Sequence, residues 1–148
     1  DDFQVDHRLN ESDERSTTVH EMSHATDKGG LLMPKPEVDF ITSLQSPMMW
    51  QFKLAEYKPE ERQGKEEDVK RFAKYVSNPS EVKARLMDLR YIADQHDLDS
   101  VELNSRDLRE LASSLGTSPE GDRIRQVMRE LTYLYDDDAI SSLLENVW

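Results

Sequence analysis

The amino-acid sequence predicts an all-α protein, a short helical array or bundle behind a disordered N-terminal arm. From residue 34 onward, apolar residues recur at the three- and four-residue spacing of helices. Asn78 and Ser118, each followed by Pro, are strong helix-start signals. No convincing period-two strand occurs, and the usual hairpin dipeptides Asn-Gly and Asp-Gly are missing. We therefore assign residues 1–33 to the arm and residues 34–148 to a helical domain.

The arm is polar and highly charged. Its first 30 residues contain eight acidic residues, three basic residues and three histidines, and their few apolar residues keep no sustained period. Such a stretch cannot bury enough apolar surface to offset the entropy lost on ordering. We expect disorder up to Lys28-Gly29-Gly30.

Three helices are predicted in the first half of the helical domain. Pro36 can occupy the first turn of the first helix, and Pro47 ends it. Residues 48–57 continue as a second short helix, and residues 58–65 are expected to form a charged connector. The third helix carries apolar residues at i, i+3, i+4 and i+7, namely Val69, Phe72, Ala73 and Val76.

The second of these helices carries the densest apolar cluster of the chain, formed by Met48, Met49, Trp50 and Phe52. Filling the core is the interpretation that we favour for it. The alternative is an exposed cluster that acts as a hot spot for a partner protein.

Four helices are predicted in the second half of the domain. Asn78 caps a long helix with Pro in its first turn. Ser105 is expected to cap a short helix that Gly116 ends, where a left-handed residue is needed. Ser118 starts the next helix, and Asp138 is expected to cap the last. The residues predicted to share one core are Leu86, Leu89, Ile92, Leu111, Leu115, Met128, Leu131 and Leu134.

Two of these helices echo one another 42 positions apart. Residues 82–92 align with residues 124–134, and the apolar anchors Val82, Leu86, Leu89 and Ile92 of the first stretch fall on Ile124, Met128, Leu131 and Leu134 of the second. A period of this size is typical of stacked helical units such as armadillo or HEAT repeats, which hold other proteins and rarely form catalytic clefts. Such units would span residues 79–118 and 119–148. Two amphipathic helices also agree by chance, because both need Leu or Ile at the same spacings.

The charge balance limits the classes of partner. Among 148 residues, 31 are acidic and 19 are basic, so the net charge is −12. That field repels phosphate backbones and anionic membrane surfaces, which disfavours nucleic acid and membrane partners. No apolar run approaches the roughly 20 residues of a membrane span. Without any Cys, disulfides, thiolate zinc sites and cysteine nucleophiles are excluded.

Acidic residues gather behind the two echoing helices. The residues expected to contact a partner are Asp94, Asp97, Asp99, Glu102, Asp136 and Asp137, with Asp138 beside them. If the echo is a true repeat, both groups would lie on corresponding corners of adjacent units. They would then form an acidic ridge able to meet a basic patch. Ordinary solvated loops explain them equally well.

One short pattern in the arm carries a chemical meaning. His20-Glu21-Met22-Ser23-His24 matches H-E-x-x-H, in which a helix presents two imidazoles to zinc and the Glu activates a water. The catalytic pattern belongs on a stable helix backed by a core, whereas this one lies in a polar arm without a recognisable third ligand. A solvated tail is therefore the interpretation that we favour, and a tail that binds metal adventitiously is the alternative. No metal or other cofactor is expected to belong to the protein.

Two further features of the arm fit passage through the secretory pathway. The chain begins at Asp1 and not at Met, as a mature protein does after signal-peptide removal, although a trimmed chain would look the same. Asn10-Glu11-Ser12 matches the N-glycosylation pattern. We expect the protein to be located in the secretory pathway or secreted.

The segment from Val82 to Ser118 resembles the start of the armadillo-like nucleotide exchange factors of heat-shock chaperones, of the type associated with BiP in the endoplasmic reticulum. There, a helix with a D-L-x-Y run and a Q-x-D ending precedes a short L-x-x-L helix. The matching residues here are Asp88, Leu89, Tyr91, Gln95, Asp97, Leu108 and Leu111. The chain has room for fewer repeats than those proteins and lacks their Trp-containing N-terminal motif. The resemblance implies binding to a chaperone ATPase domain.

The arm is similar to another family, the secreted RxLR effectors of oomycetes. The run from His7 to Asn10, followed by Asp13-Glu14-Arg15, resembles their RxLR-then-EER arrangement, with Asn10 in place of the second Arg. Such effectors carry a helical domain behind a disordered arm, so this resemblance implies a secreted protein that binds a host protein.

These observations predict a non-enzymatic protein–protein interaction module of the secretory pathway, with regulation of a chaperone ATPase as its specific form. The alternative is a secreted RxLR-like effector whose helical domain binds a host protein. A remote alternative is a zinc-dependent peptidase that uses the H-E-x-x-H pattern. In the first two cases the partner is another protein.

Overall fold

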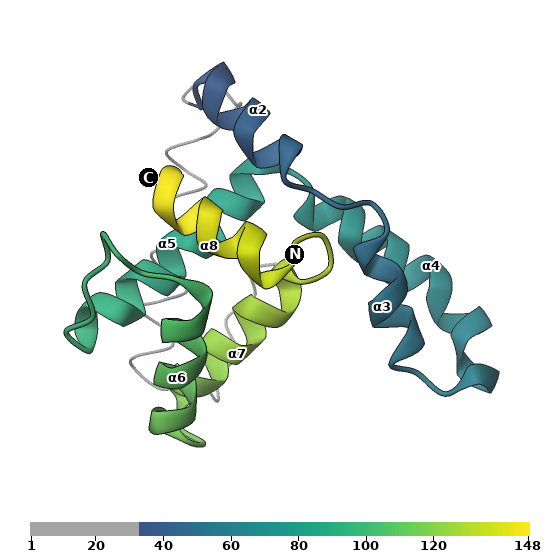
Figure 1. Cartoon of the computed structure of the whole chain (residues 1–148). Coiled ribbons are helices and arrows are strands. Elements are labelled where there is room, and N and C mark those ends of the chain that lie inside the picture. Colours follow the sequence, from purple (N-terminus) through teal and green to yellow (C-terminus); the bar gives the residue numbers. More distant parts are fainter. Residues whose placement is uncertain (1–32) are drawn as a thin grey trace.

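The computed structural model describes residues 33–148, and these residues form seven α-helices with no strand among them (Figure 1). The all-α prediction is therefore confirmed for this part of the chain. The arm predicted for residues 1–33 lies outside the described residues, apart from Met33. None of the helices between residues 33 and 148 has both the length and the apolar character that a bilayer crossing requires.

The first three described helices are α2 (Lys35–Ser43), α3 (Met49–Ala55) and α4 (Pro59–Val76). The connector predicted for residues 58–65 is wrong, because α4 already begins at Pro59. Proline is well suited to a first helical position, where its missing N–H needs no partner. Glu61 strengthens this start, since its Oε1 accepts a hydrogen bond from the Lys58 N–H at 3.3 Å. Gly64 lies on an exposed side of the helix, where it lowers stability by about 1 kcal/mol relative to Ala without ending the helix.

The remaining helices are α5 (Pro79–Gln95), α6 (Ser105–Leu115), α7 (Pro119–Leu131) and α8 (Asp137–Asn146). Asn78 and Ser118 cap α5 and α7 as predicted. Their side-chain oxygens accept backbone hydrogen bonds at 2.9 Å and 3.1 Å, respectively. Gly116 follows the end of α6 with a φ of 59°, which confirms the predicted left-handed residue. Local signals therefore set the starts of α5 and α7 and the end of α6 as expected.

The N-caps of α6 and α8 differ from the prediction. Asn104 caps α6 in place of Ser105, and Asp136 caps α8 in place of Asp138. Each cap has an extended backbone, and its Oδ1 accepts a hydrogen bond from the N–H three residues later, at 2.9 Å and 2.8 Å. Ser105 and Asp138 lie in the first turns, because a good capping residue precedes each of them and the helix starts there.

The hydrophobic core is built around α5, which contacts α2, α4, α6 and α7. Six of the eight residues predicted to share this core are buried, namely Leu86, Leu89, Ile92, Met128, Leu131 and Leu134. Leu111 and Leu115 are only partly buried and pack against the margin of the core. The core prediction is thus confirmed for the residues of α5, of α7 and of the segment after α7. It is wrong for α6, whose two predicted residues are not fully buried.

Arg90 of α5 holds the C-terminal end of α8. Its Nη2 donates to the Leu144 carbonyl at 2.7 Å and also to the Val147 carbonyl. Its guanidinium carbon lies 4.0 Å from the centroid of the Trp148 ring. Burial lowers the pKa of Arg90 to about 10. The guanidinium supplies donors to carbonyls that a helix end leaves without intrahelical partners.

The two helices of the sequence echo, α5 and α7, pack directly against each other and run antiparallel. Arg85, in the first half of α5, pairs with Glu130 in the last turn of α7, whereas His96, after the end of α5, pairs with Glu120 in the first turn of α7. In a stack of repeats, each unit is related to the next by a small rotation, so equivalent helices run in similar directions. The division into units 79–118 and 119–148 therefore stays a prediction from the sequence, and the structure shows the two echoing helices packed antiparallel.

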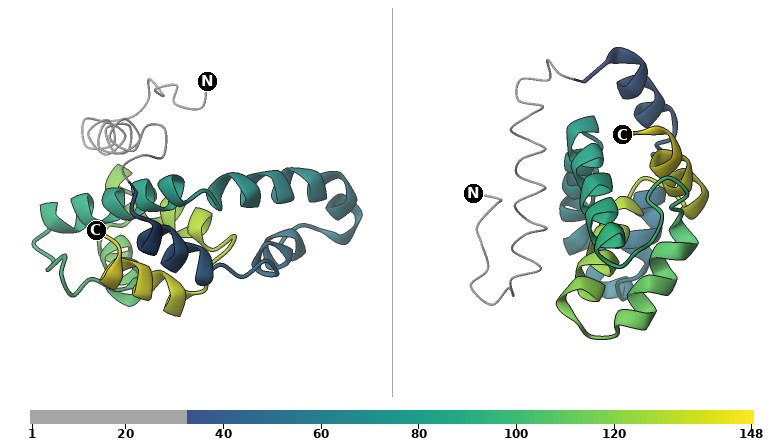
Figure 2. Two further views of the ribbon diagram at one scale, coloured as in Figure 1. Left: turned by 90° about the horizontal axis from the view of Figure 1, so that it is seen from above. Right: turned by 90° about the vertical axis from the view of Figure 1, so that its left-hand side faces the viewer.

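Helices α3 and α4 form a hairpin that projects from the other helices (Figure 1 and the left view of Figure 2). We call residues 44–77, which contain both helices, the α3–α4 hairpin. The C-terminal half of α4 buries Val69, Ala73 and Val76, and α4 contacts α5. In contrast, α3 has no fully buried residue. Most of the packing of α3 is therefore with one helix, α4.

Candidate functional site

The outer face of α3 exposes large apolar side chains. Met48, its N-cap, is 58% exposed and Phe52 is 66% exposed. These two residues lie one helical turn apart, and Ala55 continues the exposed face by another turn. The prediction that this apolar cluster fills the core is wrong for Met48 and Phe52. The reason is that α3 packs mainly on α4, which leaves its opposite side uncovered.

The backbone around this face is held in place from both ends of α3. Before the helix, the Ser46 N–H donates to the Leu134 carbonyl at 2.8 Å. After it, the Arg62 guanidinium donates to the carbonyls of Ala55 and Tyr57 at 3.0 Å and 3.1 Å. The exposed face is therefore fixed to α4 and to the segment after α7.

Aromatic rings and lysines line the other sides of the hairpin. Three ammonium groups lie over aromatic rings, at 5.4–5.7 Å from the ring centroids; the pairs are Lys53 with Tyr133, Lys65 with Tyr57 and Lys70 with Trp50. The Phe72 ring meets the Tyr133 ring edge-on, with centroids 4.7 Å apart. That ring contact ties α4 to the segment after α7.

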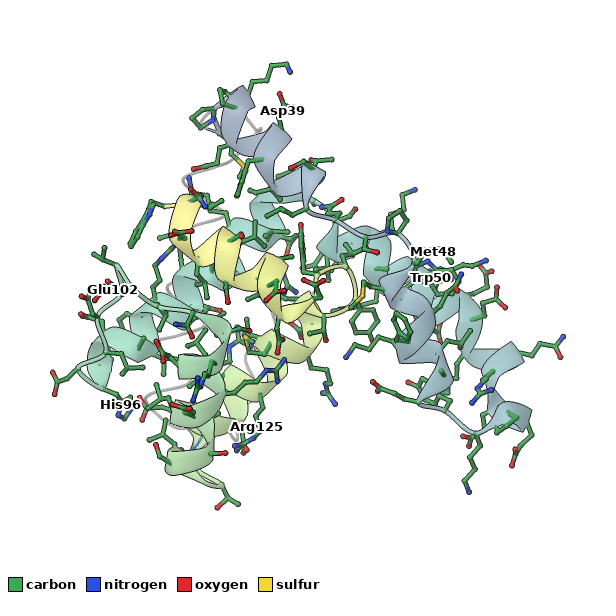
Figure 3. All side chains as sticks on the ribbon, in the orientation of Figure 1. Asp39, Met48, Trp50, His96, Glu102 and Arg125 are labelled. Atoms are coloured by element: carbon green, nitrogen blue, oxygen red, sulfur yellow. The ribbon has the colours of Figure 1, made fainter. Side chains whose placement is uncertain are left out.

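A groove lies beside Trp50, at the junction of the hairpin with the rest of the domain. We call it the Trp50 groove; its lining residues are Gln45, Pro47, Trp50, Lys70, Ala73, Lys74, Ser77 and Leu134. Met48 and Trp50 lie close together on the same end of α3 (Figure 3). The groove therefore combines an apolar lining with two exposed lysines of α4 and borders the exposed apolar face.

The lysines of this groove, Lys70 and Lys74, were not predicted as functional residues from the sequence. Lys70 and Lys74 are four residues apart and flank the buried Ala73, so their spacing alone places both on one side of α4. The Lys70 ammonium pairs with Glu66 at 2.9 Å. Among the described residues, Lys74 has no carboxylate partner. The sequence did not indicate that Trp50 of α3 would line the same groove as these lysines.

The first group of predicted acidic residues lies at and after the end of α5. Asp94, Asp97, Asp99 and Glu102 are all exposed. Asp97 has a φ of 62° and follows α5 in the left-handed region, which Asp tolerates better than most residues. The Asp99 carboxylate accepts a hydrogen bond from the Val101 N–H at 2.9 Å. Within residues 33–148, none of the four pairs with a basic side chain.

The second predicted group serves the structure of α8. Asp136 is its N-cap, and Asp137 forms a two-point ion pair with Arg109 of α6, with N–O distances of 2.7 Å and 3.2 Å. The Arg109 hydrogen bonds lower the pKa of Asp137. Because α5 and α7 are antiparallel, the two acidic groups follow opposite ends of the helix pair. Contact of either group with a partner stays a prediction.

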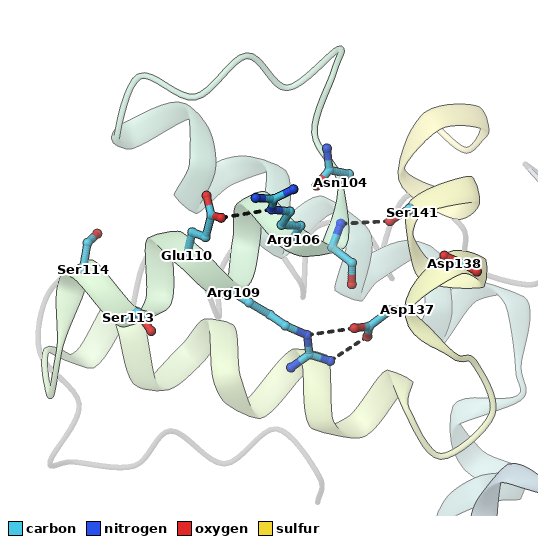
Figure 4. Close-up of a pocket in the computed structure, with 10 residues that line it drawn as sticks. Asn104, Arg106, Arg109, Glu110, Ser113, Ser114, Asp137, Asp138 and Ser141 are labelled. Carbon is cyan, nitrogen blue, oxygen red and sulfur yellow. Dashed lines mark hydrogen bonds and ion pairs between the residues drawn. The ribbon is translucent and has the colours of Figure 1, made fainter.

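A second groove lies between α6 and the start of α8 (Figure 4). Its lining residues are Asn104, Ser105, Arg106, Arg109, Glu110, Ser113, Ser114, Asp137, Asp138 and Ser141. Arg109 is engaged by Asp137, and Arg106 is engaged by Glu110 at 3.1 Å. The Ser105 N–H donates to the Ser141 hydroxyl at 3.0 Å. These polar groups thus join α6 to α8, and the described residues that line the groove include no histidine.

The predicted metal-binding pattern cannot be placed. His20 and His24 lie outside the described residues. Between residues 33 and 148, no group of three or more His, Asp and Glu side chains is arranged to hold a metal ion. His96, the histidine of this part of the chain, has its Nε2 3.2 Å from Glu120 Oε1.

No known protein family, curated protein sequence or solved structure matches this chain.

Proposed function

We propose that this chain is a non-enzymatic protein-binding module and that it contacts its partner through the α3–α4 hairpin. The observation that carries this proposal is the exposure of Met48 and Phe52 on one face of α3. Apolar side chains one turn apart are the anchors by which a helix docks into the hydrophobic groove of another protein. Full burial of a Met or Phe side chain contributes about 1.5–3 kcal/mol, so burial of these anchors would supply part of the binding free energy.

The fixed backbone of α3 supports the same proposal. The hydrogen bonds of Ser46 and Arg62 hold both ends of α3 before any partner arrives. Binding therefore does not need to order this helix, which removes part of the entropy cost of association.

For the partner, we propose the ATPase domain of a heat-shock chaperone in the secretory pathway, because of the resemblance of residues 82–118 to exchange factors. A module of this kind would bind one lobe of the ATPase domain and favour its open, nucleotide-free state by binding that state more tightly. The competing proposal is a secreted effector that captures a host protein, in line with the RxLR-like arm. Both use a protein-binding surface and no catalysis.

The binding proposal is tested by comparing two variants with the unmodified chain in partner capture. The variant Met48→Gln/Phe52→Gln removes the apolar anchors and keeps good helix formers. The matched control is Val101→Gln, because Val101 is also 66% exposed but lies far along the chain from α3. We expect the first variant to capture about tenfold less of the partner protein, or less still, as hot-spot truncations do. The control should capture as much as the unmodified chain. Equal capture by all three chains would contradict the proposal.

The partner class is tested separately, by nucleotide release from a lumenal heat-shock chaperone. Acceleration by the unmodified chain, and its loss in Met48→Gln/Phe52→Gln, would support the chaperone proposal. No acceleration at saturating protein would remove it and leave the effector proposal, whose partner the capture experiment identifies.

A further inference from the structure

We infer that the Trp50 groove takes an acidic segment of the partner protein, with an apolar side chain against Trp50 and carboxylates on Lys70 and Lys74. The inference rests on the proposed protein-binding function and names the chemistry of the partner. It follows from the lining of the groove, the spacing of its ammonium groups and the uneven charge of the chain.

The lining of the groove offers two kinds of contact side by side. Trp50, Pro47 and Leu134 provide an apolar surface, and Lys70 and Lys74 are exposed on one edge. The Lys70 ammonium already lies 5.4 Å from the centroid of the Trp50 ring. An apolar side chain that is placed on this surface brings its neighbours within reach of both ammonium groups.

The two lysines suit a pair of carboxylates. They lie four residues apart on α4, a spacing that brings side chains to within about 6 Å of each other. Glu66 is the carboxylate that the domain itself supplies, and it pairs with Lys70. In the described part of the chain Lys74 has no such partner, so an incoming carboxylate does not have to displace one there.

The charge distribution favours an acidic partner at this place. Residues 44–77 contain seven basic and six acidic residues and carry a net charge of +1. Residues 78–148 contain eight basic and fifteen acidic residues and carry −7. The field of the second region repels an acidic segment, whereas the hairpin does not. Electrostatic steering therefore guides an acidic segment to the hairpin and a basic one elsewhere.

The test is a titration of the full chain with a synthetic peptide in which Leu alternates with Asp and Glu over twelve residues. Binding is followed by nuclear magnetic resonance at the Trp50 indole and by calorimetry. The control peptide carries Asn and Gln in place of the acids. We expect the acidic peptide to shift the Trp50 indole signal and the amide peptide to bind more weakly. Added salt should lower the affinity of the acidic peptide.

Two variants of equal charge separate the groove from the hairpin as a whole. Lys70→Gln/Lys74→Gln should lower the affinity for the acidic peptide by about five- to tenfold, as expected for the loss of two exposed ion pairs. Lys58→Gln/Lys65→Gln removes two charges from the other end of the hairpin and should change affinity by less than about twofold. Equal weakening by both variants, or equal binding of both peptides, would overturn the inference.

Two further outcomes distinguish the inference from its alternatives. Concentration-dependent self-association that Lys70→Gln/Lys74→Gln abolishes would identify a second copy of the chain as the occupant and overturn the inference. If the acidic peptide fails to bind while Met48→Gln/Phe52→Gln still loses its captured partner, the inference fails and the proposed function stands. If the acidic peptide does not bind and Met48→Gln/Phe52→Gln captures as much partner as the unmodified chain, both the inference and the proposed function fail.

Discussion

Arg85 of α5 and Glu130 of α7, 45 residues apart in the chain, are joined by a hydrogen-bonded ion pair with an Nε–Oε1 distance of 2.9 Å. Glu81, one turn before Arg85, accepts a second bond from its Nη1 at 2.8 Å. Burial acts to lower the pKa of Arg85, but the carboxylates of Glu130 and Glu81 outweigh it and raise the pKa. Arg85 is therefore the shared cation of a buried seam between the two antiparallel helices.

Removal of this shared cation should destabilise the domain strongly. Arg85→Ala leaves the Glu81 and Glu130 carboxylates without their common partner, and losing one side of a buried pair costs about 3–5 kcal/mol. Chemical denaturation followed by circular dichroism measures the change in the free energy of unfolding. Arg129→Ala, at an exposed position of α7, is the control and should change it by less than about 0.5 kcal/mol. A loss below about 1 kcal/mol for Arg85→Ala would contradict the role of the seam.

Truncation of the core leucines of α5 and α7 tests the packing of these helices. Leu89 and Leu131 are fully buried, so Leu89→Ala and Leu131→Ala should each lower the free energy of unfolding by about 2–5 kcal/mol. Leu115→Ala, at the margin of the core, should cost clearly less, because its side chain is only partly buried. Equal losses in the free energy of unfolding at all three positions would contradict the partial burial of Leu115.

The N-cap of α8 can be located by mutation. Asp136→Ala removes the carboxylate that accepts the Ala139 N–H and should cost about 1 kcal/mol. Asp138→Ala removes only a favourable charge from the first turn, which is worth about 0.3–1 kcal/mol at an exposed site. Thermal unfolding of the two variants compares them directly, and a larger loss for Asp138→Ala would place the cap where the sequence first predicted it.

The Arg109–Asp137 pair should make a small contribution to stability that depends on pH. Hydrogen bonds from Arg109 hold the pKa of Asp137 below its ordinary value of 3.8. A depressed pKa means that the fold favours the ionised carboxylate, so the stabilisation is complete above the ordinary pKa and is lost as the pH falls through the lower one. Because both side chains are half exposed, the contribution should be under about 1 kcal/mol.

The measurement is the melting temperature of the unmodified chain and of Asp137→Asn as a function of pH. The gap between them should be constant at neutral pH and close in the acidic range below pH 3.8. A gap that widens on acidification would contradict the assigned direction of the pKa shift.

Local signals in the sequence determined most helix boundaries and the general fold class. Asn78 and Ser118 start helices because their side chains satisfy N–H groups within the first turn, and Gly116 follows the end of α6 because it adopts a left-handed conformation. These effects act within a few residues and do not depend on distant packing. Spacing likewise identified Leu89 and Leu131 as core residues, since the apolar face of a helix must be buried.

Tertiary structure alone decided which apolar surface stays uncovered and which charges are buried. Met48 and Phe52 are of residue types that usually fill a core. They are exposed because α3 packs mainly on α4. The pairing of Arg85 with Glu130 depends on the antiparallel packing of α5 and α7, which the echo between their sequences did not predict. Periodicity specifies the face that a helix buries, but the identity and direction of the neighbouring helix depend on contacts between residues far apart in the chain.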